Sequence, residues 1–174
     1  VRPGGAVALM CGVHASAAWM LAAEMAGLKW MAELMVLWNV GKPRVRNFGS
    51  LHTHLLWFTR PGAKHTWNSN RKSLYSNIII CKKIPIGERE HVSQKPIELT
   101  NFMVSLLTRP GDIVVDPFCG SGSTLVSAVL ADRHYIGIDK DKTHVATARR
   151  RVMHADVETE NNIAFWLNGK VIEI

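Results

Sequence analysis

The 174-residue chain has few cysteines and no two adjacent prolines. Its three cysteines, Cys11, Cys81 and Cys119, show no C-x-x-C spacing, which argues against a disulfide scaffold and a structural zinc site. A sparse, odd count fits a reducing, cytoplasmic compartment best. His52 and His54 share one face of an expected strand, but the nearby sequence offers no cysteine or carboxylate. We therefore interpret them as a structural pair and expect no metal site.

Long apolar runs are also missing. The alanine- and methionine-rich stretch 6–35 is interrupted by His14, Glu24, Lys29 and Glu33, so it holds no run of the roughly 18 apolar residues that a membrane span needs. No basic flank precedes a short apolar core with a cleavage site, so the stretch does not read as a signal peptide. We expect no membrane partner.

Acidic residues are scarce relative to basic ones. The chain has 14 aspartates and glutamates against 21 lysines and arginines, and its net charge is +7. This balance favours a polyanionic partner such as nucleic acid, although many soluble proteins are basic without binding one. With 47% hydrophobic and 20% charged residues the chain is typical of a globular protein, and its length allows one domain with a real core.

Apolar runs that alternate with helix-forming segments predict an α/β fold with a mostly parallel sheet. Strands are expected at 6–11, 30–38, 51–59, 77–81, 113–115 and 135–138, and a further one in the tail at 161–174. Helices are expected at 15–26, from Pro96, at 123–131 and from Thr143, which is expected to cap the last helix. Arg149 to Arg151 are expected on the solvated face of that helix.

The stretch VVDPFCGSGST, residues 114–124, predicts a buried strand, a glycine turn and a helix start. A P-loop would need a lysine after the second glycine, and a dinucleotide fingerprint would need a third glycine where this chain has Leu125. Neither pattern is present. The turn therefore does not predict a pyrophosphate ligand.

What remains is Asp116 at a strand end, the pair Gly120 and Gly122, and Asp139 at the end of the next strand. A carboxylate there can accept hydrogen bonds from both hydroxyls of a ribose, and the glycines let the backbone approach the ligand. This arrangement favours S-adenosylmethionine. The alternative is that the turn joins a strand to a helix and that the aspartates cap helices, with no ligand.

Residues 94–152, QKPIELTNFMVSLLTRPGDIVVDPFCGSGSTLVSAVLADRHYIGIDKDKTHVATARRRV, resemble the C-terminal half of DNA amino-methyltransferases of the β group. These enzymes methylate N6 of adenine or N4 of cytosine. The resemblance implies a Rossmann-like S-adenosylmethionine-dependent methyltransferase fold and DNA as partner. It assigns cofactor-binding roles to Lys95, Pro96, Asp116, Pro117, Phe118, Gly120, Gly122, Thr124 and Asp139. It also implies that Lys42, Arg44 and Arg46 lie in a loop that faces DNA.

In this family a [D/N/S]-P-P-[Y/F/W] motif, which grips the flipped-out base, precedes the segments found here. The motif is absent because none of the seven prolines is adjacent to another, so no catalytic residue is assigned. The resemblance implies an N-terminally truncated enzyme that lacks its central catalytic strand and is inactive alone, and whose sheet a second chain could complete. The alternative is a non-catalytic cofactor- or nucleic-acid-binding partner subunit.

The expected organisation is a single, partial methyltransferase domain over 1–174. Residues 1–62 hold the strands and helix that follow the catalytic motif, and 63–92 form a variable connector like a target-recognition segment. Residues 93–158 are the cofactor-binding half, and 159–174 are the C-terminal tail. The target base and the recognition sequence stay open, because target recognition has no residue code.

Overall fold

The computed structural model describes residues 1–39, 51–69, 75–91 and 93–167, with side chains up to Ala155. The chain divides into two compact units. The first unit comprises Val1–Lys83 with Leu106–Thr108, and the second comprises Ile84–Ser105 with Arg109–Ile174.

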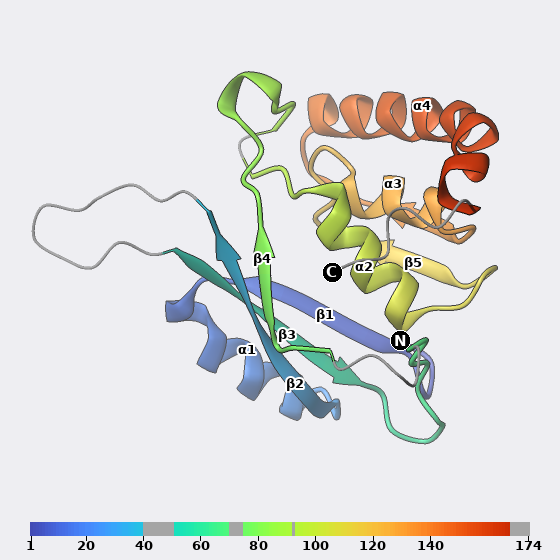
Figure 1. The fold of residues 1–174 in the computed structure, drawn as a ribbon. Coiled ribbons are helices and arrows are strands. Elements are labelled where there is room, and N and C mark those ends of the chain that lie inside the picture. Colours follow the sequence, from blue (N-terminus) through green and yellow to red (C-terminus); the bar gives the residue numbers. More distant parts are fainter. Residues whose placement is uncertain (40–50, 70–74, 92, 168–174) are drawn as a thin grey trace, which may run out of the picture. The chain divides into compact units, whose positions relative to one another are not determined.

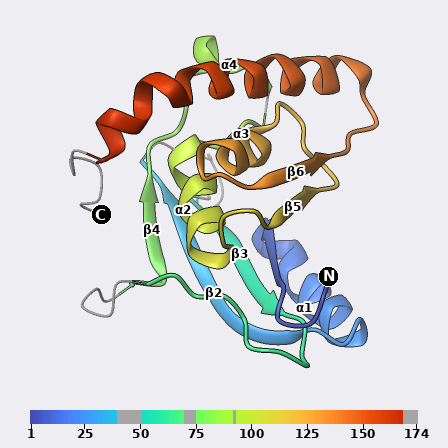
Figure 2. The same ribbon diagram turned by 90° about the vertical axis from the view of Figure 1, so that its right-hand side faces the viewer.

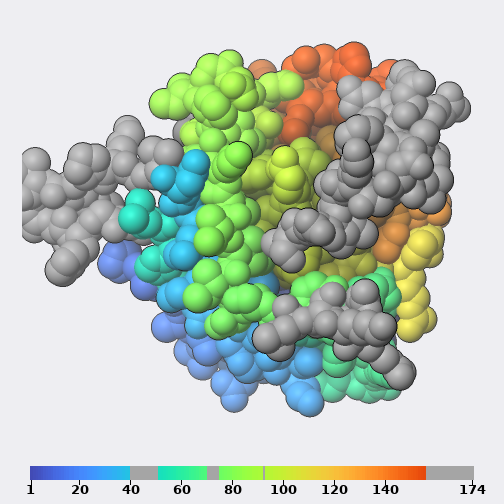
Figure 3. Space-filling view, viewed as in Figure 1, coloured from blue at the N-terminus to red at the C-terminus, as the bar shows by residue number. Residues whose placement is uncertain are grey.

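The first unit is a four-stranded sheet with one helix (Figure 1). Its strands are β1 (Ala6–Cys11), β2 (Lys29–Trp38), β3 (His52–Thr59) and β4 (Ile78–Cys81), in the order β1-β3-β2-β4. Six consecutive residues of β3, from His54 to Thr59, are buried, as expected for a central strand. β4 is an edge strand, and Figure 3 shows it at the surface beside β2.

Strand directions in this sheet correct one expectation. β3 runs antiparallel to both β1 and β2, with Thr59 opposite both Ala6 and Lys29, whereas β4 is parallel to β2. The sheet is therefore not mostly parallel. The helix after β1 leads to β2, which is the parallel arrangement that strand–helix alternation predicts. β3 is inserted between these two strands in the opposite direction, and alternation along the chain does not reveal that insertion.

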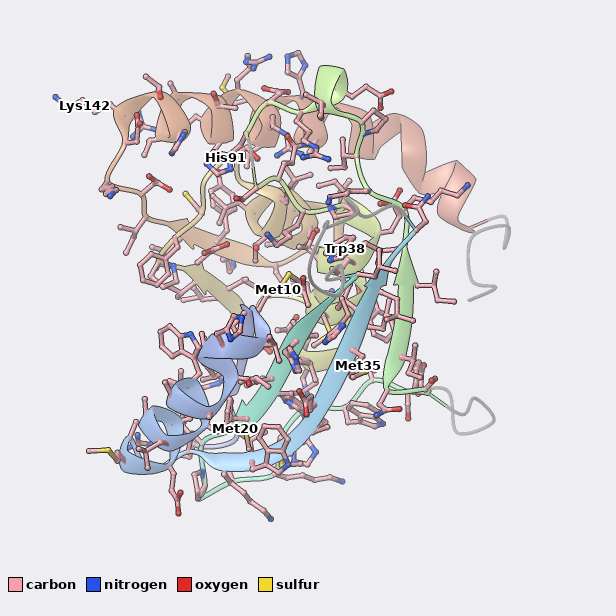
Figure 4. All side chains as sticks on the ribbon, turned by 90° about the vertical axis from the view of Figure 1, so that its left-hand side faces the viewer. Met10, Met20, Met35, Trp38, His91 and Lys142 are labelled. Carbon is pink, nitrogen blue, oxygen red and sulfur yellow. The ribbon has the colours of Figure 1, made fainter. Side chains whose placement is uncertain are left out.

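Helix α1 (Val13–Met25) covers one face of this sheet (Figure 1). Its buried residue Ala23 packs with Cys11 of β1 and with Leu56 and Phe58 of β3. At the end of β2, the indole nitrogen of Trp38 (Figure 4) donates to Thr53 Oγ1 at 2.9 Å. Within the described part of the chain, no helix is long and apolar enough to cross a membrane.

The second unit is built around a parallel strand pair. After the short helix η1 (Ile86–Glu88) come α2 (Ile97–Leu107), whose last two residues belong to the first unit, β5 (Ile113–Asp116), α3 (Ser123–Leu130), β6 (His134–Gly137) and α4 (Lys142–Leu167). Helix α3 connects β5 to β6, and α4 packs against α3 (Figure 2). The buried core between these elements consists of Cys119, Leu125, Val126, Ala148, Val152 and Ala155.

Both ends of α4 differ from expectation. The backbone N–H and the hydroxyl of Thr143 donate to Asp141 Oδ1 at 2.8 and 2.7 Å, so Asp141 rather than Thr143 caps the helix. The helix continues to Leu167, so the strand expected at 161–174 is wrong for 161–167, and the rest lies outside the described residues. The sequence has neither glycine nor proline between 142 and 167 to stop a helix.

One face of the β5–β6 pair is uncovered by the described residues. Ile113 and Val115, which share a face of β5, are 63% and 55% exposed. Ile136, which pairs with Val115, and Ile138, two positions later on the same face, are exposed as well. Strands of parallel sheets are normally covered on both faces, which is why their sequences are apolar throughout. β5 thus has the apolar sequence of a strand buried on both faces, whereas one of its faces is exposed.

Candidate functional site

The glycine turn between β5 and α3 has the backbone that the sequence pattern predicts. Gly120 and Gly122 have positive φ angles of 51° and 81°, in the region that residues with a side chain rarely adopt. Within the turn, the Gly122 N–H donates to the Cys119 carbonyl at 2.7 Å. The Cys119 N–H donates to the carbonyl of Ile138, just after β6, at 2.9 Å. The turn is therefore held at the carboxyl ends of both strands.

Asp139 lies against this turn. Its Oδ2 accepts the Gly120 N–H and its Oδ1 accepts the Asp141 N–H, both at 2.9 Å, and His144 Nδ1 lies 3.3 Å from Oδ1. These contacts hold the pKa of Asp139 below its ordinary value, chiefly through the Asp141 N–H and further through the Gly120 N–H and His144. The side chain is therefore a carboxylate at neutral pH, 13% exposed at the strand end.

Asp116 and the K-P pair border the same turn. Asp116 Oδ1 accepts the Phe118 N–H at 3.0 Å, and the Lys95 carbonyl accepts the Ser123 hydroxyl at 2.9 Å, which ties the segment before α2 to the start of α3. Burial lowers the pKa of Lys95, and the charge of Asp116 opposes that shift. Pro96 is buried, and its carbonyl accepts the Thr100 N–H in the first turn of α2.

The structure thus brings Lys95, Pro96, Asp116, Gly120, Gly122 and Asp139 together in the second unit. Pro117 and Phe118 lie on the exposed side of the turn, and Phe118 is 81% exposed. Thr124 is half-buried in the first turn of α3. The residues expected to face DNA, Lys42, Arg44 and Arg46, lie outside the described part of the chain.

Three residues at the turn were not assigned from the sequence. The ring of His91, labelled in Figure 4, lies 3.5 Å from where a Cβ on Gly120 would be, and its centroid is 4.3 Å from that of His144. Arg151 Nη1 donates to the Ser121 carbonyl at 2.6 Å. The expectation of a solvated face holds for Arg149 and Arg150, which are exposed, and is wrong for Arg151.

A sequence signal for Arg151 exists: it follows the buried Ala148 by three positions, so it borders the buried stripe of α4. For His91 there is none, because it lies in a connector without periodicity. His52 and His54 stack edge to face, and His54 Nδ1 is paired with Glu33 of β2, so a carboxylate 21 positions earlier in the chain does lie beside this pair. No group of three metal-ligating side chains occurs among the residues that the structure describes.

Comparison with known proteins identifies the family. The family model N6_N4_Mtase, described as DNA methylase, matches residues 1–150. The type II methyltransferase M.HindIII of Haemophilus influenzae is 34% identical over 120 residues, which cover 56% of this chain and 39% of that protein. M2.DpnII of Streptococcus pneumoniae is 28% identical and is matched over 93% of this chain and 64% of its own length. The chain thus spans less than two thirds of these curated relatives.

A solved structure agrees with the sequence comparisons. The crystal structure of an M1.HpyAVI–SAM complex has a TM-score of 0.79 and 28% identity, and the match covers 87% of this chain and 76% of that one. The α/β fold is therefore that of the S-adenosylmethionine-dependent DNA methyltransferases. Fold, motif order and family model agree, and the chain belongs to the DNA methylase family of N6-adenine and N4-cytosine amino-methyltransferases.

Proposed function

We propose that this chain is the cofactor-binding part of a site-specific DNA methyltransferase that transfers a methyl group from S-adenosylmethionine to N6 of adenine or N4 of cytosine. The observation that carries the proposal is the Asp139 carboxylate, held by the Gly120 N–H at the carboxyl ends of two parallel strands. Ligands of open α/β sheets bind at such strand ends. Because the amine can attack the sulfonium methyl in line, positioning supplies most of the acceleration.

Asp139 is proposed to hold the ribose of the cofactor. A carboxylate has about four acceptor positions, and the N–H groups of Gly120 and Asp141 and the ring of His144 already use three. Accepting both ribose hydroxyls therefore requires one contact to open. The contact to His144 is the longest at 3.3 Å and comes from a side chain, so it is the one expected to yield.

The residues proposed to line the rest of this site are those of the K-P and D-P-F-x-G-x-G motifs. Each lies on the turn or at an element end that contacts it. The set is Lys95, Pro96, Asp116, Pro117, Phe118, Gly120, Gly122 and Thr124. When bound there, S-adenosylmethionine would supply the methyl group, while the chain's own residues fix the cofactor's position. We place the protein in the cytoplasm, in keeping with the free, buried state of its three cysteines.

Replacing Asp139 with alanine tests the cofactor site. Loss of hydrogen bonds to a charged group is expected to weaken S-adenosylmethionine binding roughly ten- to a hundredfold. Isothermal calorimetry measures this, with circular dichroism to show that the variant is folded. Glu98→Ala, which removes an exposed carboxylate from the first turn of α2, is the control and should bind like the parent chain. Unchanged affinity in folded Asp139→Ala would remove Asp139 from the site.

DNA is the proposed substrate, and the net charge of +7 supports binding through phosphate groups. We expect weak, sequence-independent binding whose affinity falls steeply with salt. Replacing Lys42, Arg44 and Arg46 with alanine should flatten the plot of log affinity against log salt by about 0.9 for each phosphate that these side chains no longer neutralise. Fluorescence anisotropy measures the slope.

The charge-matched control replaces three exposed lysines of the first unit, Lys29, Lys64 and Lys82. The two triple variants have the same net charge, so only local binding to phosphate separates their slopes. Equal slopes, or no binding by the parent chain at low salt, would count against a DNA-facing segment at 42–46.

A further strand is proposed to complete the sheet of the second unit. Among the described strands β5 pairs with β6 alone, and Ile113 and Val115 on its face are exposed. A parallel strand from an N-terminal segment or a second chain would form hydrogen bonds with the unpaired backbone groups on the open edge of β5. The helix that connects such a strand would cover the exposed face. If chemistry also comes from another chain, this chain is a cofactor-binding partner subunit, which is the second candidate function.

A further inference from the structure

Helix α4 passes the glycine turn at very close range. A Cβ placed on Gly122 would lie 2.8 Å from Ala148 Cβ and 3.0 Å from Ala148 Cα. Approaches below 3.0 Å do not occur between ordinary carbon atoms, so only glycine fits opposite Ala148 without movement. One helical turn beyond this contact, Arg151 reaches the turn from the same side of the helix.

The guanidinium of Arg151 binds the middle of the turn. Its Nη1 donates to the Ser121 carbonyl at 2.6 Å and to Ser121 Oγ at 3.0 Å, and Ser123 Oγ lies 3.4 Å away. Ser121 is 3% exposed, so water has little access to its carbonyl. A buried carbonyl without a donor is costly, and a charged donor binds it more strongly than a neutral one.

The neighbouring arginines have different surroundings. Arg149 is exposed, and the guanidinium of Arg150 is paired with Glu90 of the connector before α2. Among the described residues, Arg151 is the one of these three arginines whose side chain hydrogen-bonds to the turn. Burial lowers the pKa of Arg151, and the charge of Glu90 opposes this shift. Because burying a charged guanidinium is costly, its hydrogen bonds to the turn indicate a specific structural role for Arg151.

That role follows from the planarity of the peptide bond. The Ser121 carbonyl and the Gly122 N–H belong to one peptide plane. Arg151 holds the carbonyl end, and the Cys119 carbonyl accepts the N–H end at 2.7 Å. With both ends held, the plane cannot rotate, and the positive φ angles of Gly120 and Gly122 on either side of Ser121 are kept.

We propose that Arg151 is a positioning residue of the cofactor site, which fixes the Ser121–Gly122 peptide and thereby the orientation of the Gly120 N–H toward Asp139. Arg151 contacts the turn rather than the ligand. It acts by removing the freedom that the two glycines would otherwise give the loop. This inference rests on the proposed function, because it concerns the same S-adenosylmethionine site.

The test compares substitutions at neighbouring arginines by calorimetry with S-adenosylmethionine. Arg151→Met keeps the length of the side chain and removes its donors, and we expect affinity to fall by roughly tenfold or more. Arg151→Lys should recover part of the loss, because an ammonium can bind the carbonyl but not with the planar fork of arginine. Arg149→Met is the matched control and should bind like the parent chain.

Two further measurements separate positioning from simple loss of stability. Val152→Ala shortens a buried side chain next to Arg151, and its melting temperature calibrates how much affinity a general loss of stability removes. Guanidinium ion at low millimolar concentration should restore binding to Arg151→Ala and leave Val152→Ala unchanged. The inference would be overturned if Arg151→Met bound S-adenosylmethionine like the parent chain. It would also be overturned if Val152→Ala, at the same melting temperature as Arg151→Met, lost as much affinity. Absence of binding by the parent chain would instead overturn the proposed function.

Discussion

The purified 174-residue chain is expected to transfer no methyl group to DNA, even where it binds S-adenosylmethionine. Binding the cofactor does not by itself lower the barrier, because catalysis requires interactions that strengthen in the transition state. The groups that would hold the target amine in line with the methyl belong to the D-P-P-Y type of motif, and no two prolines of this chain are adjacent. Transfer of labelled methyl from S-adenosylmethionine to DNA measures this directly.

Supplying a segment that carries the D-P-P-Y type of motif should restore transfer. An N-terminal segment that carries the motif, fused to the chain or added in trans, would pair with β5 and bring the motif beside the glycine turn. The control is the same segment with the acid and the aromatic of the motif replaced by alanine, which should complete the sheet without supporting chemistry. Robust methylation by the purified chain alone would refute this prediction and show that another group in the chain grips the base.

Gly122→Ala is expected to have the largest effect on stability of any single substitution in the turn. The new methyl group would meet Ala148 at 2.8 Å, and the residue would need a φ angle of 81°. Overpacking costs about 1–3 kcal/mol and a left-handed backbone about 1–2 kcal/mol, so unfolding should become easier by about 2–5 kcal/mol. Urea denaturation of the variant and the parent chain measures the difference.

Two other glycines separate these causes. Gly111 has nearly the same φ angle, 78°, but nothing lies within 4 Å of a Cβ placed there, so Gly111→Ala measures the backbone cost alone. Gly87 has neither a positive φ angle nor a neighbour within 4 Å, and Gly87→Ala should be close to neutral. If Gly122→Ala costs no more than Gly111→Ala, α4 can move away from the turn and the close approach is not a constraint.

The motif that defines the site could be predicted from the sequence because its parts are local. Asp116, Gly120 and Gly122 lie within seven consecutive residues, and Asp139 follows one strand–helix unit later. A strand end, a turn and a helix start each have a characteristic residue pattern, so their succession predicts where the carboxylates come together. The role of Arg151 depends on a contact with Ser121 thirty residues away, for which the sequence has no comparable local pattern.

In the sheet of the first unit, too, local patterns predict the elements and contacts between distant residues decide their arrangement. The positions of the strands and of α1 follow from apolar runs and helix-forming residues, and the structure confirms them to within two residues at each end. The spatial order of the strands does not follow from these patterns. β3 lies between β1 and β2, where its Leu56 and Phe58 pack against α1, and this is a contact between segments far apart in the sequence. Alternation of elements therefore predicted the parallel relation of β1 and β2 and missed the strand that separates them.

The place of β3 also has a consequence for the order in which the chain becomes structured during synthesis. β1 and α1 are synthesised before β3, which supplies their packing partners Leu56 and Phe58 and pairs with β1. At about 5–20 residues per second, β1 waits a few seconds for its partner. During that interval β1, α1 and β2 lack the strand that pairs with both β1 and β2 and against which α1 packs.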